Sequence, residues 1–138
     1  CALERAKGTA MLRTFVAVLA AYAVLVVCTL LMVGSFLLLW PEAFSPDMSK
    51  PYAGPEFILY LETLLSLLFA VLAGVVATAI GGRRAAFVLV GVMLVLGMVT
   101  ILGEQGMKPL WSILAATAMG PVGAMAGSRL RRDRPGQA

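Results

Sequence analysis

The fold is decided by residues 57–102, which read FILYLETLLSLLFAVLAGVVATAI (57–80), GGRR (81–84) and AAFVLVGVMLVLGMVTIL (85–102). The hydrocarbon layer of a membrane is about 30 Å thick and a helix rises about 1.5 Å per residue, so a spanning helix needs roughly 20 mostly apolar residues. Both apolar runs approach or exceed this length, and the arginines between them mark a return to water. This stretch therefore predicts two membrane helices joined by a short charged turn.

Two further apolar runs flank this pair. Backbone groups in lipid must be hydrogen-bonded within the chain, and the runs lack the alternation of a membrane barrel strand, so each run is expected to be helical. The chain has 138 residues, 61% of them hydrophobic and 13% charged, a balance that a soluble domain of this size could not bury. We predict an all-α, four-transmembrane-helix bundle in a single integral membrane domain over residues 1–138, with helices at about 15–39, 57–80, 85–102 and 110–127.

The distribution of charge predicts the orientation of these helices. Arginines precede the first span, form the turn at residues 81–84 and follow the fourth span, whereas the connections at 41–55 and 103–108 contain none. The positive-inside rule then places both termini in the cytoplasm and those two connections outside. The rings of Trp40, Tyr52, Tyr60 and Trp111 fall at the expected outer interface, where amphipathic rings settle.

The net charge of +4 predicts contact with lipid rather than with nucleic acid, because the arginines adjoin helix ends and no soluble domain presents them. Each such arginine can gain about 1 kcal/mol from an anionic leaflet. Membrane lipid is thus an expected partner. The residues expected to fix topology and contact lipid head groups are Arg83, Arg84, Arg129, Arg131 and Arg132.

Helices in lipid associate through close backbone approach and hydrogen bonds, so small residues on one helical face predict packing surfaces. The fourth span carries one such face and the second span another, and we expect the two to meet inside the bundle. The third span has no comparable face and is expected to be the most exposed to lipid. The predicted packing residues are Ser112, Ala116, Gly120, Gly123, Gly127, Ser66, Ala73 and Ala77.

The sequence offers little for catalysis. It contains no histidine, which excludes histidine ligands to haem or zinc and histidine general bases in this chain. The two cysteines, Cys1 and Cys28, are too far apart in sequence for a redox pair, and no serine sits in a nucleophile motif. We therefore expect no enzymatic activity, no cofactor and no metal site.

Glu62 is the one residue with potential chemistry, because it lies about 7–8 Å below the expected outer interface. A carboxylate at that depth is costly and usually faces the bundle interior. In one interpretation it binds a proton or a cation, since loss of water favours its neutral form. In the other it is structural, reaching the interface or hydrogen-bonding Tyr22, Tyr60 or Ser66, with Tyr22 less suitable because it lies nearer the cytoplasmic side.

Two resemblances follow from these residues. Four short spans with one membrane carboxylate resemble the small multidrug resistance transporters in architecture only, since their glutamate lies in the first helix. The chain is more similar to uncharacterised bacterial four-helix inner-membrane proteins, through its Met11-Leu12-Arg13 start, Trp111, the Gly120-Pro121-Val122-Gly123 run and the arginines after it. This resemblance implies a bacterial inner-membrane location and no known activity.

Together these patterns favour a non-catalytic structural or accessory subunit that docks to itself or to a larger membrane assembly. The alternative is a small proton- or cation-coupled transporter or channel, in which Glu62 titrates and the proline within the fourth span, Pro121, provides a flexible point.

Overall fold

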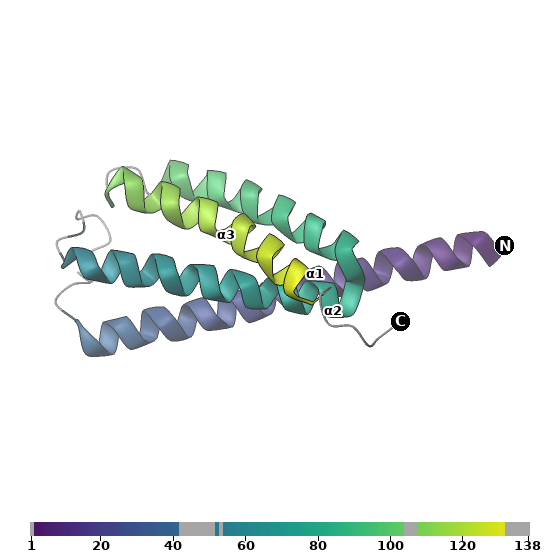
Figure 1. Cartoon of the computed structure of the whole chain (residues 1–138), viewed down its shortest axis with the longest axis horizontal. Helices are drawn as coiled ribbons and strands as arrows, with labels where there is room; N and C mark the ends of the chain where they lie inside the picture. The colour runs from purple at the N-terminus through teal and green to yellow at the C-terminus, as the bar shows by residue number, and fades with distance from the viewer. Residues whose placement is uncertain (1, 42–51, 53, 104–107, 132–138) are drawn as a thin grey trace.

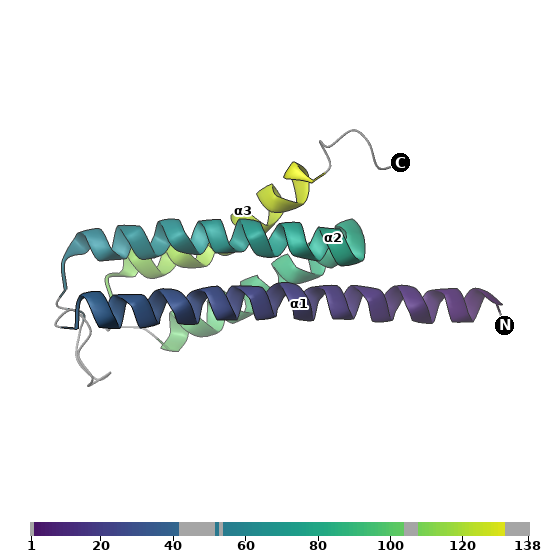
Figure 2. The ribbon, with the colours of Figure 1, turned by 90° about the horizontal axis from the view of Figure 1, so that it is seen from below.

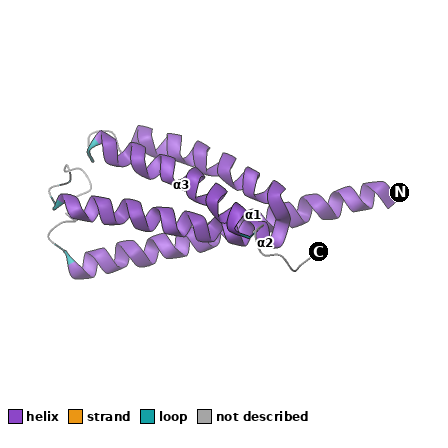
Figure 3. Ribbon diagram, in the orientation of Figure 1, coloured by secondary structure: helices purple, strands orange, loops and turns teal. Residues whose placement is uncertain are grey.

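The computed structural model describes residues 2–41, 52, 54–103 and 108–131, with side chains from residue 8 onward, and within these ranges the regular structure is helical without strands (Figure 3). The helices are α1 (Ala2–Leu39), α2 (Glu56–Gly103) and α3 (Leu110–Leu130). Each is long and apolar enough to cross a membrane. The all-α prediction is therefore confirmed. The start expected near residue 15 is wrong, because helical structure in α1 begins at Ala2.

The prediction of four separate helices is not confirmed, because the second and third predicted spans are continuous as α2, in which two helical segments meet at a kink. One residue interrupts it: Gly82 has φ 72° and ψ −168°. Positive φ costs a residue with a Cβ atom roughly 1–2 kcal/mol, whereas glycine adopts it freely. The turn expected over residues 81–84 is thus reduced to one glycine. Residues 56–81 are called the first arm of α2 below, and residues 83–103 the second arm.

The contacts of α3 show that α2 folds back at Gly82. Gly74 of the first arm lies against the backbone of Ala124, and Gly97 of the second arm against the side chain of Thr117. On a straight helix the two glycines would be about 35 Å apart, whereas their partners on α3 are separated by only about 10 Å. The two arms accordingly run in opposite directions from the turn, and α3 packs against both (Figures 1 and 2).

The first arm of α2 also holds α1. At one end the Arg13 Nε donates a hydrogen bond of 2.5 Å to the carbonyl oxygen of Ile80, one of the carbonyls that the break at Gly82 deprives of a helical partner. At the other end the ring of Trp40 meets that of Phe57 edge to face, with centroids 5.8 Å apart. Among the described residues the first arm of α2 therefore lies between α1 and α3, and α1 extends past the turn of α2 (Figure 1).

The core is concentrated in the half of the bundle that contains the turn. Small side chains from all three helices form it, including Ala17, Ala73, Ala77 and Ala124, each fully buried. A smaller cluster joins α1 to the first arm near the opposite end. In the second arm buried residues stop at Met93, and residues 94–103 include none. The expected exposure of the third span thus applies to its second half.

Candidate functional site

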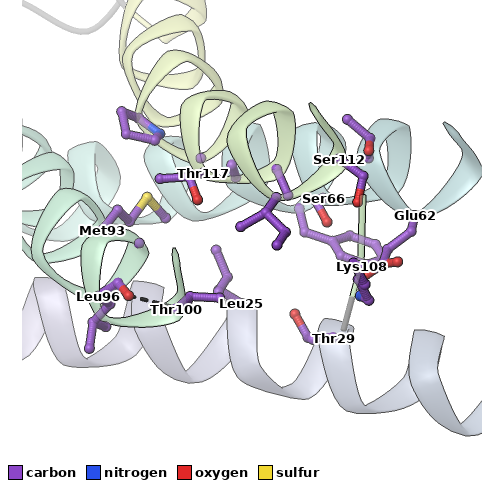
Figure 4. Close-up of a pocket in the computed structure, with 18 of the residues that line it drawn as sticks. Leu25, Thr29, Glu62, Ser66, Met93, Leu96, Thr100, Lys108, Ser112 and Thr117 are labelled. Carbon is purple, nitrogen blue, oxygen red and sulfur yellow. Dashed lines mark hydrogen bonds and ion pairs between the residues drawn. The ribbon is translucent and has the colours of Figure 1, made fainter. Parts of the chain in front are cut away.

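A pocket of about 280 Å³ lies between the helices in the half of the bundle remote from the turn of α2, and α1, both arms of α2 and α3 contribute to its wall (Figure 4). Apolar side chains such as Leu25, Phe69 and Met93 form part of this wall. Its polar residues, which come from every helix and from the residue before Pro109, are Tyr22, Thr29, Glu62, Thr63, Ser66, Thr100, Lys108, Ser112 and Thr117.

Glu62 forms an ion pair at the mouth of this pocket. The Lys108 Nζ donates to the Glu62 Oε1 over 2.8 Å, and the side chains of the two residues are 24% and 25% exposed, Lys108 first. The sequence suggested Tyr22, Tyr60 or Ser66 as partner. Ser66 and Tyr22 line the same pocket, whereas the Tyr60 ring stacks on that of Trp111 with centroids 5.0 Å apart. The pair ties the first arm of α2 to the segment that enters α3.

Lys108 is the site residue that sequence reasoning missed. It belongs to the connection 103–108 that the charge pattern places outside the membrane, directly before Pro109 and the apolar run of α3. The signal was nonetheless present. Glu62 and Lys108 are expected at the same side of the membrane, and a lysine's long stem lets its ammonium group reach several ångströms from its backbone.

The hydroxyl groups of the pocket present acceptors to its interior. The Thr63 Oγ1 donates to the Leu59 carbonyl oxygen at 2.8 Å and the Thr100 Oγ1 to the Leu96 carbonyl oxygen at 3.0 Å, the local bonding typical of threonine in helices. A hydroxyl has one proton and two lone pairs, so a hydroxyl that donates to its own helix can still accept. Together with the Glu62 carboxylate, these oxygens favour a ligand that donates hydrogen bonds.

Tyr52 lies close enough to Glu62 for the carboxylate charge to affect the pKa of its hydroxyl. Its hydroxyl donates to the Pro55 carbonyl oxygen at 3.0 Å. Burial raises the pKa of the Tyr52 hydroxyl above its ordinary value of 10.0, and the negative charge of Glu62 raises it further, because both disfavour a second anion there. The residue expected at the outer interface therefore belongs to the surroundings of the ion pair.

The predicted packing residues divide between helix contacts and the pocket. In α3, Gly123 and Gly127 are buried against the backbone of the first arm, near Leu67 and Val71 respectively. In the first arm of α2, Ala73 and Ala77 are fully buried and belong to the core. The remaining predicted packing residues line the pocket: Ser66, Ser112, Ala116 and Gly120. Small side chains thus both allow close helix approach and leave space inside the bundle.

The predicted lipid-contacting arginines gather at the other end of the bundle. Arg83, Arg129 and Arg131 line a second pocket there, and Arg84 adjoins it in sequence without lining it. Arg132 lies outside the described residues. The charged side chains of the described residues are therefore segregated, with Glu56, Glu62 and Lys108 near one end and the arginines near the other.

Within residues 2–41, 52, 54–103 and 108–131, no group of three or more histidine, cysteine, aspartate or glutamate side chains could hold a metal ion. No family model, no curated protein and no solved structure matches this chain. The interpretation of the site therefore depends on its geometry.

Proposed function

We propose that this chain is an integral membrane protein with four membrane crossings that binds a small organic cation in the pocket beside Glu62. The crossings are α1, the two arms of α2, and α3. Each arm of α2 and α3 have more than 20 residues, which corresponds to about 31 Å or more and matches the hydrocarbon layer. The two ends of α2 then lie on the same side of the membrane.

The orientation proposed from the sequence fits this arrangement. The described arginines lie at the end that contains the turn of α2, and Trp40, Tyr60 and Trp111 lie at the opposite end. A cytoplasmic location of the arginine end follows from the positive-inside rule. Both termini would then be cytoplasmic, and the pocket would open toward the outer face of a bacterial inner membrane.

The observation that carries the proposed function is the ion pair between the Glu62 carboxylate and the Lys108 ammonium group. The lysine side chain is a tethered ammonium group, held at 2.8 Å by the carboxylate, in front of a wall of hydroxyl acceptors. An added ammonium compound can make the same charge-assisted bond while its apolar part packs against Phe69 and Met93. Lys108 is thus the internal competitor of the solute, and it keeps the carboxylate neutralised when the pocket is empty.

The test uses butylammonium, which has the chemistry of a lysine side chain, and 1-butanol as its neutral counterpart. Binding to the full chain in lipid nanodiscs is measured by calorimetry at neutral pH. Wild type should bind butylammonium at least tenfold more tightly than 1-butanol, because a charge-assisted hydrogen bond contributes roughly 1.5–3 kcal/mol. Glu62→Gln should remove this preference.

Glu56→Gln is the matched control, since Glu56 is the other glutamate whose side chain the structure describes, is exposed in the first turn of α2 and does not line the pocket. It should retain the preference for the cation. Equal binding of the two probes to wild type, or equal losses in the two variants, would contradict the proposal. Counterflow of labelled butylammonium in liposomes then separates a transporter from a protein that only binds.

A second candidate function, the non-catalytic accessory subunit, is favoured by the outer half of the second arm. Residues 94–103 include no buried residue in this chain, although they lie beside the pocket end of the bundle. A helix of a second membrane protein, or of a second copy, could cover this surface instead of lipid. Native mass measurement after mild extraction tests this: a reproducible partner at fixed stoichiometry supports it, and a monomer contradicts it.

A further inference from the structure

The arginine end of the bundle contains a pocket of about 260 Å³ that has no role in the proposed function. Three segments form it: Thr78 lies near the end of the first arm of α2, residues 83–90 begin the second arm, and residues 125–131 contain the end of α3 and its C-cap. Three arginines line it: Arg83, Arg129 and Arg131.

The charge of this pocket has no internal counterpart among the described residues. The glutamates whose side chains the structure describes, Glu56 and Glu62, belong to the opposite end of the bundle, and no carboxylate lines the pocket within the described part of the chain. Three like charges held together repel one another, so an anion that neutralises them would be stabilising. Guanidinium groups bind phosphate oxygens through paired hydrogen bonds.

The lining of the pocket divides into a charged part and an apolar part. Ala86, Phe87, Val90 and Met125 provide the apolar part, and the Arg83 guanidinium lies 5.3 Å from the centroid of the Phe87 ring. The hydroxyls of Thr78 and Ser128 donate to the carbonyl oxygens of Gly74 and Met125 at 2.8 and 2.7 Å. The donors that remain for a ligand are therefore the guanidinium groups.

We propose that this pocket is a specific site for the phosphate group of an anionic phospholipid. The phosphate is held by Arg83, Arg129 and Arg131, and the start of the lipid's apolar part lies along Phe87, Val90 and Met125. This differs from the general attraction of basic residues to an anionic surface, because it assigns a stoichiometry of one lipid and distinguishes among neighbouring arginines. Arg84 is adjacent in sequence to Arg83 but does not line the pocket.

The experiment measures lipid retention by native mass spectrometry of the full chain, with phosphatidylglycerol, phosphatidylcholine and inorganic phosphate as probes. Wild type should retain one phosphatidylglycerol at least tenfold more strongly than phosphatidylcholine. Arg83→Gln and Arg129→Gln should each weaken that retention by more than about tenfold, as expected for loss of a charge-assisted hydrogen bond to phosphate.

Arg84→Gln is the matched control, since it removes the same charge one residue away. It should weaken retention by no more than about fivefold, the effect of one basic residue near an anionic surface. Equal losses in Arg83→Gln and Arg84→Gln would overturn the site and leave only surface attraction. Protection from thermal unfolding is measured with inorganic phosphate and with phosphatidylglycerol. Equal protection by the two would overturn the assignment of a lipid ligand, since the site would then take a soluble anion. The fold of each variant is checked by its helical circular dichroism.

Discussion

Replacement of Gly123 by alanine tests the contact between α3 and the first arm of α2. An ideal Cβ atom at Gly123 would lie 2.7 Å from the Ala70 Cβ and 2.8 Å from the Leu67 carbonyl oxygen. Ordinary contacts between such atoms are about 3.5–4.0 Å, so α3 would have to move away by about 1 Å. One of the opposing atoms belongs to the backbone and the other to an alanine, and neither can rotate aside.

The cost of that movement can be separated from helix propensity. Gly123→Ala gains up to about 1 kcal/mol because alanine is a better helix former than glycine, and it loses about 1–3 kcal/mol through overpacking. Gly91→Ala shares the gain without the loss, because a Cβ atom at Gly91 would meet nothing within 4 Å. We therefore expect Gly123→Ala to be less stable than Gly91→Ala by about 1–3 kcal/mol.

The assay is unfolding in mixed micelles, with increasing sodium dodecyl sulphate in dodecyl maltoside, followed by circular dichroism. Tryptophan fluorescence provides a second signal, because the Trp111 ring of α3 stacks on the Tyr60 ring of α2. A difference between the two variants below about 0.5 kcal/mol, the usual scatter of surface substitutions, would refute the close approach of α3 to α2.

Three further predictions concern the turn and the ion pair. Gly82→Ala should destabilise the protein by about 1–2 kcal/mol in the same assay, although the space around Gly82 is open, and an unchanged stability would contradict a positive φ there. Glu62→Gln and Lys108→Gln should be non-additive, with a coupling free energy of about 0.5–3 kcal/mol in a double-mutant cycle, and strictly additive losses would contradict the ion pair. The tyrosinate absorbance of Tyr52, identified by difference from Tyr52→Phe, should appear above pH 10 and shift to lower pH in Glu62→Gln, because Glu62 raises the pKa of Tyr52. Since that pKa is raised in the folded state, its contribution to stability is present below pH 10 and is lost as pH rises through the folded value, and an unshifted titration would contradict the proximity of the two groups.

The helical class and the positions of the apolar runs could be predicted because the requirement for continuous apolar length in lipid is strong. The observed ends of α2 and α3, at residues 56 and 103 and at 110 and 130, differ from the predicted outer limits by no more than a few residues. The junction within α2 was less predictable. Two glycines followed by two arginines indicate a turn, but composition alone does not say that a single residue with positive φ suffices to reverse the chain.

The candidate site was only partly predictable, because it joins residues that are far apart in the sequence. Glu62 was identified because a carboxylate within an apolar run is costly, which is a property of one residue and its neighbours in sequence. Its pairing with Lys108 joins residues 46 positions apart, and the pocket depends on contributions from three helices. Ser66 and Gly120 are small residues of the kind found at helix contacts. Only the arrangement of the helices shows that they line a pocket.

The measurement that tests the central claim most directly is the affinity for butylammonium of Lys108→Gln compared with that of Glu62→Gln, each in lipid nanodiscs at neutral pH. If Lys108 competes with the solute for the carboxylate, Lys108→Gln should bind the cation more tightly than wild type. The gain should be up to about fivefold, since a solvent-accessible ion pair contributes up to about 1 kcal/mol. Glu62→Gln should bind it at least tenfold more weakly. Competition between Lys108 and the solute requires the affinities of the two variants to change in opposite directions. Weaker binding in both variants, or no change in either, would contradict it.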